Sequence, residues 1–135
     1  DLNAFLGIRQ IDKMEWLIKR RSENHALYKK LFGDVLYYQK SDSSSVVCSI
    51  HFGALAKSTI ERKAIVKALE DNGIETRIFS AGNLGLHPFW YNRYGKASFP
   101  MADRIHHAGF FLPNHPLLKP KDIKFIVGVV LKAIK

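Results

Sequence analysis

The chain has 135 residues, of which 47% are hydrophobic and 24% charged, and its formal net charge is +9. This length and composition suit one globular domain with a real core, and they exclude a disordered chain. No run of residues approaches the roughly 20 apolar residues that span a bilayer, and the start lacks the charged and apolar regions of a signal peptide. The single cysteine, Cys48, cannot form an internal disulfide, so we expect an inert, buried thiol and a cytoplasmic protein.

The positive charge raises the question of a nucleic-acid partner. Lysines and arginines occur in every segment, and the only clusters are Lys19–Arg21 and Lys29–Lys30. Zinc-finger spacing and the aromatic signature of RNA-binding domains are both missing from the sequence. Dispersed charge of this kind is typical of solvated helix faces. A nucleotide-sugar substrate, a partner domain or an acidic surface would explain it as well as DNA would.

The first 33 residues have apolar positions at helical spacing and contain no proline. They predict one long helix over 1–33, or two helices joined near Gly7, with Gly33 as the C-terminal cap. Apolar residues at helical spacing follow Asp1 directly, without a polar capping run before them. We therefore expect the chain to be the C-terminal piece of a longer protein. The positions at helical spacing are Leu2, Phe5, Leu6, Ile11, Met14, Leu17, Ile18 and Leu31.

A loop and a strand are predicted after this helix. Residues 35–38 suit a short edge segment, and the polar run 40–45 suits a loop. Residues 46–52 are rich in β-branched and aromatic residues, which predicts a strand that Gly53 ends.

A second helix and a second strand come next. Ser58 and Glu61 form a capping box that begins the helix, and Asn72–Gly73 ends it. Residues 74–81 then predict a strand, which completes a strand, a crossover helix and another strand. The expected buried stripe of the helix is Ile60, Ala64, Ile65, Ala68 and Leu69.

The last third of the chain begins with an aromatic segment, 86–98, which suits either an irregular lid or a short helix. Residues 101–107 predict a short helix and 110–112 a third strand. His106 and His107 diverge by about 100° on a helix and make a poor metal pair, so we expect no metal site. A closing helix follows Pro120. Its expected apolar face is Ile123, Ile126, Val127, Val130, Leu131 and Ile134.

Side chains able to bind an anion or a sugar gather at strand ends within 75–115. Arg77 offers a planar fork of donors for phosphate or carboxylate. Gly82 and Gly85 flank Asn83 and allow a tight reversal or close approach to a ligand. The alternative interpretation is a simple turn followed by a solvated loop, because most loops carry no site. The neutral donors and acceptors in this stretch are Asn83, His87, Asn114 and His115.

These motifs together resemble the C-terminal part of the DegT family of sugar aminotransferases, which are vitamin B6-dependent enzymes that act on nucleotide-linked keto-sugars. The opening helix resembles the family pattern "dlqAAlGl.QL.kl", with a trailing "R...N" at Arg20–Asn24. The patterns "gIetR", "GN", "qP" and "GF.LPnH" recur in the same order and cover nearly the whole chain. They match Ile74–Arg77, Gly82–Asn83, His87–Pro88 and Gly109–His115.

The resemblance implies a fold and a role. It implies an α/β (α+β) architecture, namely the small C-terminal domain of a type I aminotransferase fold, with a long N-terminal helix and helices packed on a sheet of roughly three strands. Residues 1–135 would form this single domain, with 1–33 as an interdomain helix and a large cofactor domain upstream. The substrate-binding residues would be Arg77, Asn83, His87 and His115.

The resemblance also implies a cofactor and partners. The parent enzyme would use pyridoxal 5'-phosphate or pyridoxamine 5'-phosphate, bind a nucleotide-sugar and work as a homodimer. The cofactor lysine of aminotransferases, or the histidine that replaces it in 3-dehydratases, would lie upstream of Asp1. We therefore expect no catalytic residue in this chain, no cofactor held by it alone and no activity without the rest of the enzyme. Phe5 and His87 depart from the family's usual Ala and Gln.

Two further interpretations remain open at the level of sequence. One is a stand-alone basic α/β module that binds nucleic acid or another anionic partner. The other is a purely structural dimerisation domain. These two and the substrate-cleft domain of a sugar enzyme differ in whether the side chains of Arg77, Asn83 and His87 converge on one site.

Overall fold

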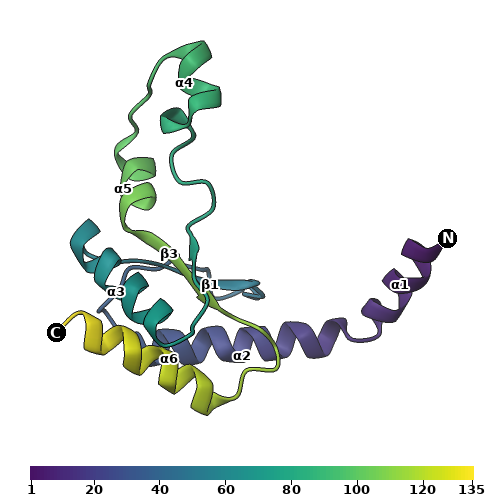
Figure 1. Cartoon of the computed structure of the whole chain (residues 1–135). Coiled ribbons are helices and arrows are strands. Elements are labelled where there is room, and N and C mark those ends of the chain that lie inside the picture. The colour runs from purple at the N-terminus through teal and green to yellow at the C-terminus, as the bar shows by residue number, and fades with distance from the viewer.

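The computed structural model describes residues 1–135 as a small α+β domain with an arm on one side and a helix projecting on the other (Figure 1). Its centre is a three-stranded antiparallel sheet with the strand order β1-β3-β2. The strands are β1 (His51–Leu55), β2 (Arg77–Ile78) and β3 (Gly109–Pro113). β1 and β2 both run antiparallel to β3, so they are parallel to each other. The predicted strand, crossover helix and strand are confirmed, with β3 inserted between the two strands.

The N-terminal region forms two helices, α1 (Leu2–Ile11) and α2 (Met14–Phe32). The prediction of a junction near Gly7 was wrong, because the helices separate at Asp12 and Lys13. There the backbone N–H of Lys13 donates to the Gln10 carbonyl at 3.0 Å, three residues back instead of four, which interrupts the α-helical ladder. Gly33 ends α2 with φ of 53°, which confirms it as the cap.

The first two strands are shorter than predicted. Pairing with β3 starts only at His51, so residues 46–50 stay outside the sheet, and Gly53 lies inside β1 instead of ending it. The glycine leaves room for the Phe79 ring, because a Cβ would lie 2.7 Å from one of its carbons and the ring would have to move. β2 is limited to two residues, since Ser80 takes a positive φ of 50° just beyond it.

The core lies between one face of the sheet and the helices α2, α3 (Thr59–Asp71) and α6 (Pro120–Ala133). The Phe52 ring stacks on Tyr28 at 4.8 Å and on Phe32 at 5.9 Å, joining β1 to α2. The apolar face predicted for α6 is confirmed for Ile123, Ile126, Val127 and Val130, which are buried, while Leu131 and Ile134 are partly buried.

The stripe predicted for α3 was partly wrong. Ile65 and Leu69 are buried, whereas Ile60 is 82% exposed and Ala64 is also exposed. At 100° per residue, Ile60 lies about 140° around the helix from Ile65, so both cannot face the core. Ser58 caps the helix as predicted, with its hydroxyl oxygen accepting from the Glu61 N–H at 3.1 Å.

The arm consists of the 3₁₀ turn η1 (Leu84–Leu86), α4 (Pro88–Tyr94) and α5 (Pro100–Ala108), and α4 lies far from the sheet (Figure 1). The aromatic segment is therefore a short helix with irregular flanks, and the predicted helix at 101–107 is confirmed. A proline occupies the first turn of both α4 and α5, where its missing N–H costs no hydrogen bond. None of the helices is long and apolar enough to cross a membrane.

Candidate functional site

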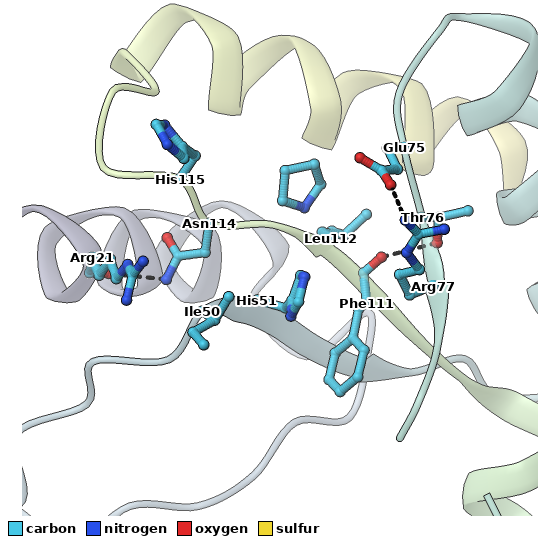
Figure 2. Close-up of a pocket in the computed structure, with 11 residues that line it drawn as sticks. Arg21, Ile50, His51, Glu75, Thr76, Arg77, Phe111, Leu112, Asn114 and His115 are labelled. Carbon is cyan, nitrogen blue, oxygen red and sulfur yellow. Dashed lines mark hydrogen bonds and ion pairs between the residues drawn. The ribbon is translucent and has the colours of Figure 1, made fainter. Parts of the chain in front are cut away.

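A pocket of about 250 Å³ lies on the face of the sheet that the helices leave open. Residues from β1, β2 and β3 meet there with Arg21 of α2 and with the segment that follows β3 (Figure 2). The His51 ring stacks on Phe111 at 5.2 Å and forms an aromatic floor. We call this the sheet-face pocket. Its lining is Arg21, Ile50, His51, Glu75, Thr76, Arg77, Phe111, Leu112, Pro113, Asn114 and His115.

The guanidinium of Arg77 forms an ion pair with the Glu75 carboxylate beside the pocket (Figure 2). The two side chains are 67% and 70% exposed, so water screens the attraction between them and the pair is weak. β2 holds Arg77 opposite Phe111 in the register of the sheet, which directs both side chains to the open face. Arg77 can therefore exchange Glu75 for another anion at little cost.

Asn114 is the most deeply buried polar member of the lining, at 1% exposure. Its Nδ2 donates to the Ser49 carbonyl at 2.7 Å and to the Arg21 carbonyl at 3.3 Å, which ties β3 to the segment before β1 and to α2. The Oδ1 of Asn114 is buried without a hydrogen-bond partner, and so is the Nε of Arg21. A buried polar group without a partner costs free energy. These two atoms and the Oγ of Ser49 have almost no accessible surface, so they form a buried polar cluster next to the pocket and are not exposed to a ligand in it.

Arg21 and His51 were not assigned to the site from the sequence. Arg21 was noted only in the basic cluster Lys19–Arg21 and inside the stretch Arg20–Asn24, and His51 only as a member of a strand. No local pattern connects them, because they lie on different elements and meet through tertiary packing.

Of the four predicted substrate-binding residues, the structure brings Arg77 and His115 together in the sheet-face pocket. His115 is exposed at the rim, where its Nδ1 accepts from the Leu117 N–H at 3.2 Å. His87 lies in the arm as the cap of α4, with its Nε2 2.6 Å from the Ala81 carbonyl oxygen.

Asn83 holds the base of the arm together. Its side chain is 2% exposed, and its Nδ2 donates to the Ala97 carbonyl at 3.1 Å and to Asp103 Oδ1 at 2.5 Å. Its Oδ1 accepts from the Gly85 N–H at 2.8 Å. The hydroxyl of Ser98 and the amide of Asn83 both hold the pKa of Asp103 below its usual range. These bonds give Asn83 a structural role, and substrate contact by Asn83 stays a prediction.

The structure brings no group of three or more His, Cys, Asp or Glu side chains into metal-binding geometry. The sheet-face pocket also has no lysine in its lining, so it offers no amine for covalent attachment of an aldehyde cofactor. The donors present suit an anion and hydroxyl groups.

A three-stranded antiparallel sheet covered by helices on one face, with two helices leading into it, is the arrangement of a small domain of the type I aminotransferase fold. The putative sugar aminotransferase Spr1654 from Streptococcus pneumoniae, in its PMP form, superimposes with a TM-score of 0.84 at 20% identity, over 96% of this chain and 33% of that one. The E. coli GDP-4-keto-6-deoxy-D-mannose-3-dehydratase with bound hydrated PLP gives a TM-score of 0.77 at 24% identity, over 92% and 33%.

The family profile that matches residues 1–131 shows that the chain belongs to the DegT/DnrJ/EryC1/StrS aminotransferase family. A GDP-4-keto-6-deoxy-D-mannose 3-dehydratase from Yersinia pseudotuberculosis is 27% identical over 139 residues, which are 98% of this chain and 35% of that protein. The chain spans about a third of the length of the relatives it matches. The resemblance to the DegT family is confirmed.

Proposed function

We propose that this chain forms one wall of the substrate cleft in a pyridoxal- or pyridoxamine-phosphate-dependent enzyme that acts on nucleotide-linked keto-sugars. The enzyme would be an aminotransferase or a 3-dehydratase of surface polysaccharide or deoxysugar biosynthesis. The observation that carries the proposal is the exposed guanidinium of Arg77 in one pocket with the exposed rings of His51 and His115. These side chains can donate to an anion and pair with hydroxyl groups, which are the groups that a nucleotide-linked sugar presents.

The sheet-face pocket suits the substrate side of such a site, because its lining offers Arg77, His51 and His115. We therefore propose that a large domain holds the cofactor and that this chain closes over the substrate. When bound there, the cofactor supplies the electron sink for the reaction at the sugar. We also propose that the enzyme works as a homodimer.

The choice between amino transfer and dehydration depends on one residue of the proposed cofactor domain. The first test is to read the coding sequence that precedes Asp1. A lysine at the cofactor position would assign an aminotransferase, and a histidine there would assign a dehydratase. A preceding region without a large α/β domain would contradict the proposal and favour the stand-alone basic module.

The second test is kinetic and uses the full-length protein with pyridoxal phosphate, glutamate and GDP-4-keto-6-deoxymannose or its dTDP counterpart. Loss of one charge-assisted hydrogen bond, at about 1.4 kcal/mol per factor of ten, should raise KM roughly tenfold in Arg77→Gln. Lys124→Gln removes the same charge from an exposed site on α6 and should leave KM unchanged. Equal KM values in the two variants would remove Arg77 from the substrate site.

A further inference from the structure

A second depression, distinct from the sheet-face pocket, has a strongly basic lining. It has a volume of about 340 Å³ and lies beyond the end of β2, between α3 and α5. Four of its eight lining residues are basic or can become cationic, and none is acidic. We call it the basic pocket. Its lining is Thr59, Arg62, Lys63, Ile78, Phe79, Gly82, His106 and His107.

Two side chains of the basic pocket are held in place by hydrogen bonds, one on α3 and one on α5. Arg62 of α3 donates its Nε to the Gly109 carbonyl at 3.0 Å, which fixes the base of the guanidinium against β3. The Nδ1 of His106 on α5 accepts from the Asn83 N–H at 3.3 Å. With Nδ1 in use as an acceptor, a neutral His106 ring carries its proton on Nε2, which makes Nε2 a donor. Neither hydrogen bond uses the terminal nitrogens of Arg62 or the Nε2 of His106.

The charge balance distinguishes this pocket from the sheet-face pocket. In the sheet-face pocket the Glu75 carboxylate competes for Arg77, whereas the lining of the basic pocket contains no carboxylate. The nearest acidic groups are Asp103 on α5, whose charge interacts with His107, and Glu61 on α3, whose carboxylate accepts from the Lys57 N–H. Neither forms an ion pair with Arg62 or Lys63, so both basic side chains can bind an anion.

Phosphate is the chemistry that fits this arrangement. A phosphate group has several acceptor oxygens and about two negative charges, and it binds best where donors approach from several sides. The guanidinium of Arg62 supplies a fork, Lys63 a mobile ammonium, and Thr59 a hydroxyl. No donor of this pocket belongs to the group of substrate-binding residues predicted from the sequence.

We propose that the basic pocket is a phosphate-binding site that recognises a phosphate or diphosphate group through Arg62, Lys63, His106 and His107. The phosphate can come from two sources, the diphosphate of a nucleotide-linked substrate or a free phosphate compound. The first source rests on the proposed function, and the second is independent of it. Ile78 of the strand that carries Arg77 lines the pocket, so the basic pocket and the sheet-face pocket share β2.

The test is calorimetric titration of the full-length protein with inorganic pyrophosphate. The variant is Lys63→Gln with His107→Gln, because both side chains line the pocket and are exposed. The matched control is Lys124→Gln with Lys121→Gln, which removes charge from α6 instead. We expect the affinity for pyrophosphate to fall at least tenfold in the variant and to stay within twofold in the control. Thermal unfolding of each variant checks that the fold is intact.

Kinetics with the nucleotide-sugar separate the two sources. A matching rise in KM with unchanged kcat, and competitive inhibition by pyrophosphate, would assign the pocket to the substrate's diphosphate. Weaker pyrophosphate binding with unchanged KM would assign it to a separate phosphate compound. Unchanged pyrophosphate affinity in the variant, or no binding by the wild-type protein, would overturn the site. Lack of any turnover by the wild-type protein would overturn the proposed function and leave the pyrophosphate result standing.

Discussion

Gly82 is the position at which one added methyl group should disturb the fold most clearly. It takes φ of 63°, and a Cβ there would lie 2.3 Å from His106 Nδ1 and 3.1 Å from the His106 Cα. The second contact is with backbone, so a change of rotamer cannot relieve it. The left-handed conformation costs about 1–2 kcal/mol for a residue with a Cβ. Overpacking adds about 1–3 kcal/mol, so Gly82→Ala should destabilise the domain by about 2–5 kcal/mol.

Gly73→Ala is the matched control. Gly73 has a similar φ of 69°, but a Cβ there would meet no atom within 4 Å. Gly73→Ala should lower the free energy of unfolding only by the cost of the left-handed backbone, about 1–2 kcal/mol. For 135 residues the unfolding entropy converts 1 kcal/mol into about 3.5 °C of Tm, so we expect drops of about 7–17 °C for Gly82→Ala and 3.5–7 °C for Gly73→Ala. The assay is thermal unfolding of the 135-residue chain followed by circular dichroism. Equal drops in the two variants would refute the contact with His106.

Two further predictions concern buried and ionised groups. Tyr28 is fully buried, and its hydroxyl donates to the Pro113 carbonyl at 2.9 Å. Tyr28→Phe should therefore lower the free energy of unfolding, measured in urea, by about 1–2 kcal/mol. Tyr38→Phe removes no such bond and should have little effect. The pKa of Asp103 is lowered by the Ser98 hydroxyl and the Asn83 amide. The stability that ionised Asp103 gives to the arm is therefore present above the usual carboxyl pKa and is lost as the pH falls through the lowered value. A carbon-13 NMR titration of the Asp103 carboxyl should therefore show a midpoint below the usual range, and Ser98→Ala should move that midpoint upward. A midpoint that Ser98→Ala does not move would contradict the assigned cause.

Local signals predicted the helices well. Gly33, Ser58 and Asn72–Gly73 each specify a helix end through a backbone conformation or a side-chain hydrogen bond, and each end lies where the sequence indicated. The helix break at Asp12 was missed, because the apolar pattern runs through it without a glycine or proline.

Strand bounds could not be read from the sequence in the same way. Residues 46–50 are as rich in β-branched residues as a strand, but a strand needs a partner, and β3 reaches only as far as His51. Gly53 was interpreted as a stop because glycine often ends a strand. Its actual role is to leave room for the Phe79 ring, a contact between residues 26 positions apart that no local pattern encodes.

The candidate site, like the strands, could be predicted only in part from the sequence. Arg77 and His115 could be predicted from their residue types at strand ends, and they do line one pocket. Asn83 and His87 carried the same kind of signal, but the side chain of Asn83 is buried among hydrogen bonds inside the arm. The sequence shows which side chains can bind a ligand, whereas packing decides which of them still have a free donor or acceptor.

The exposed apolar side chains of α1 fit the proposed larger enzyme, in which other protein would cover them. α1 has no buried residue, and its apolar side chains are exposed on several sides, with Leu2 at 72% and Ile8 at 62%. A helix that is apolar on most of its surface is normally covered by other protein. The sheet-face pocket differs, because Arg77, His51 and His115 in its lining are exposed polar side chains that apolar protein surface would leave without partners. The two surfaces therefore suit different ligands. We therefore expect protein to cover α1 in the full-length enzyme, while the sheet-face pocket stays open to a polar ligand.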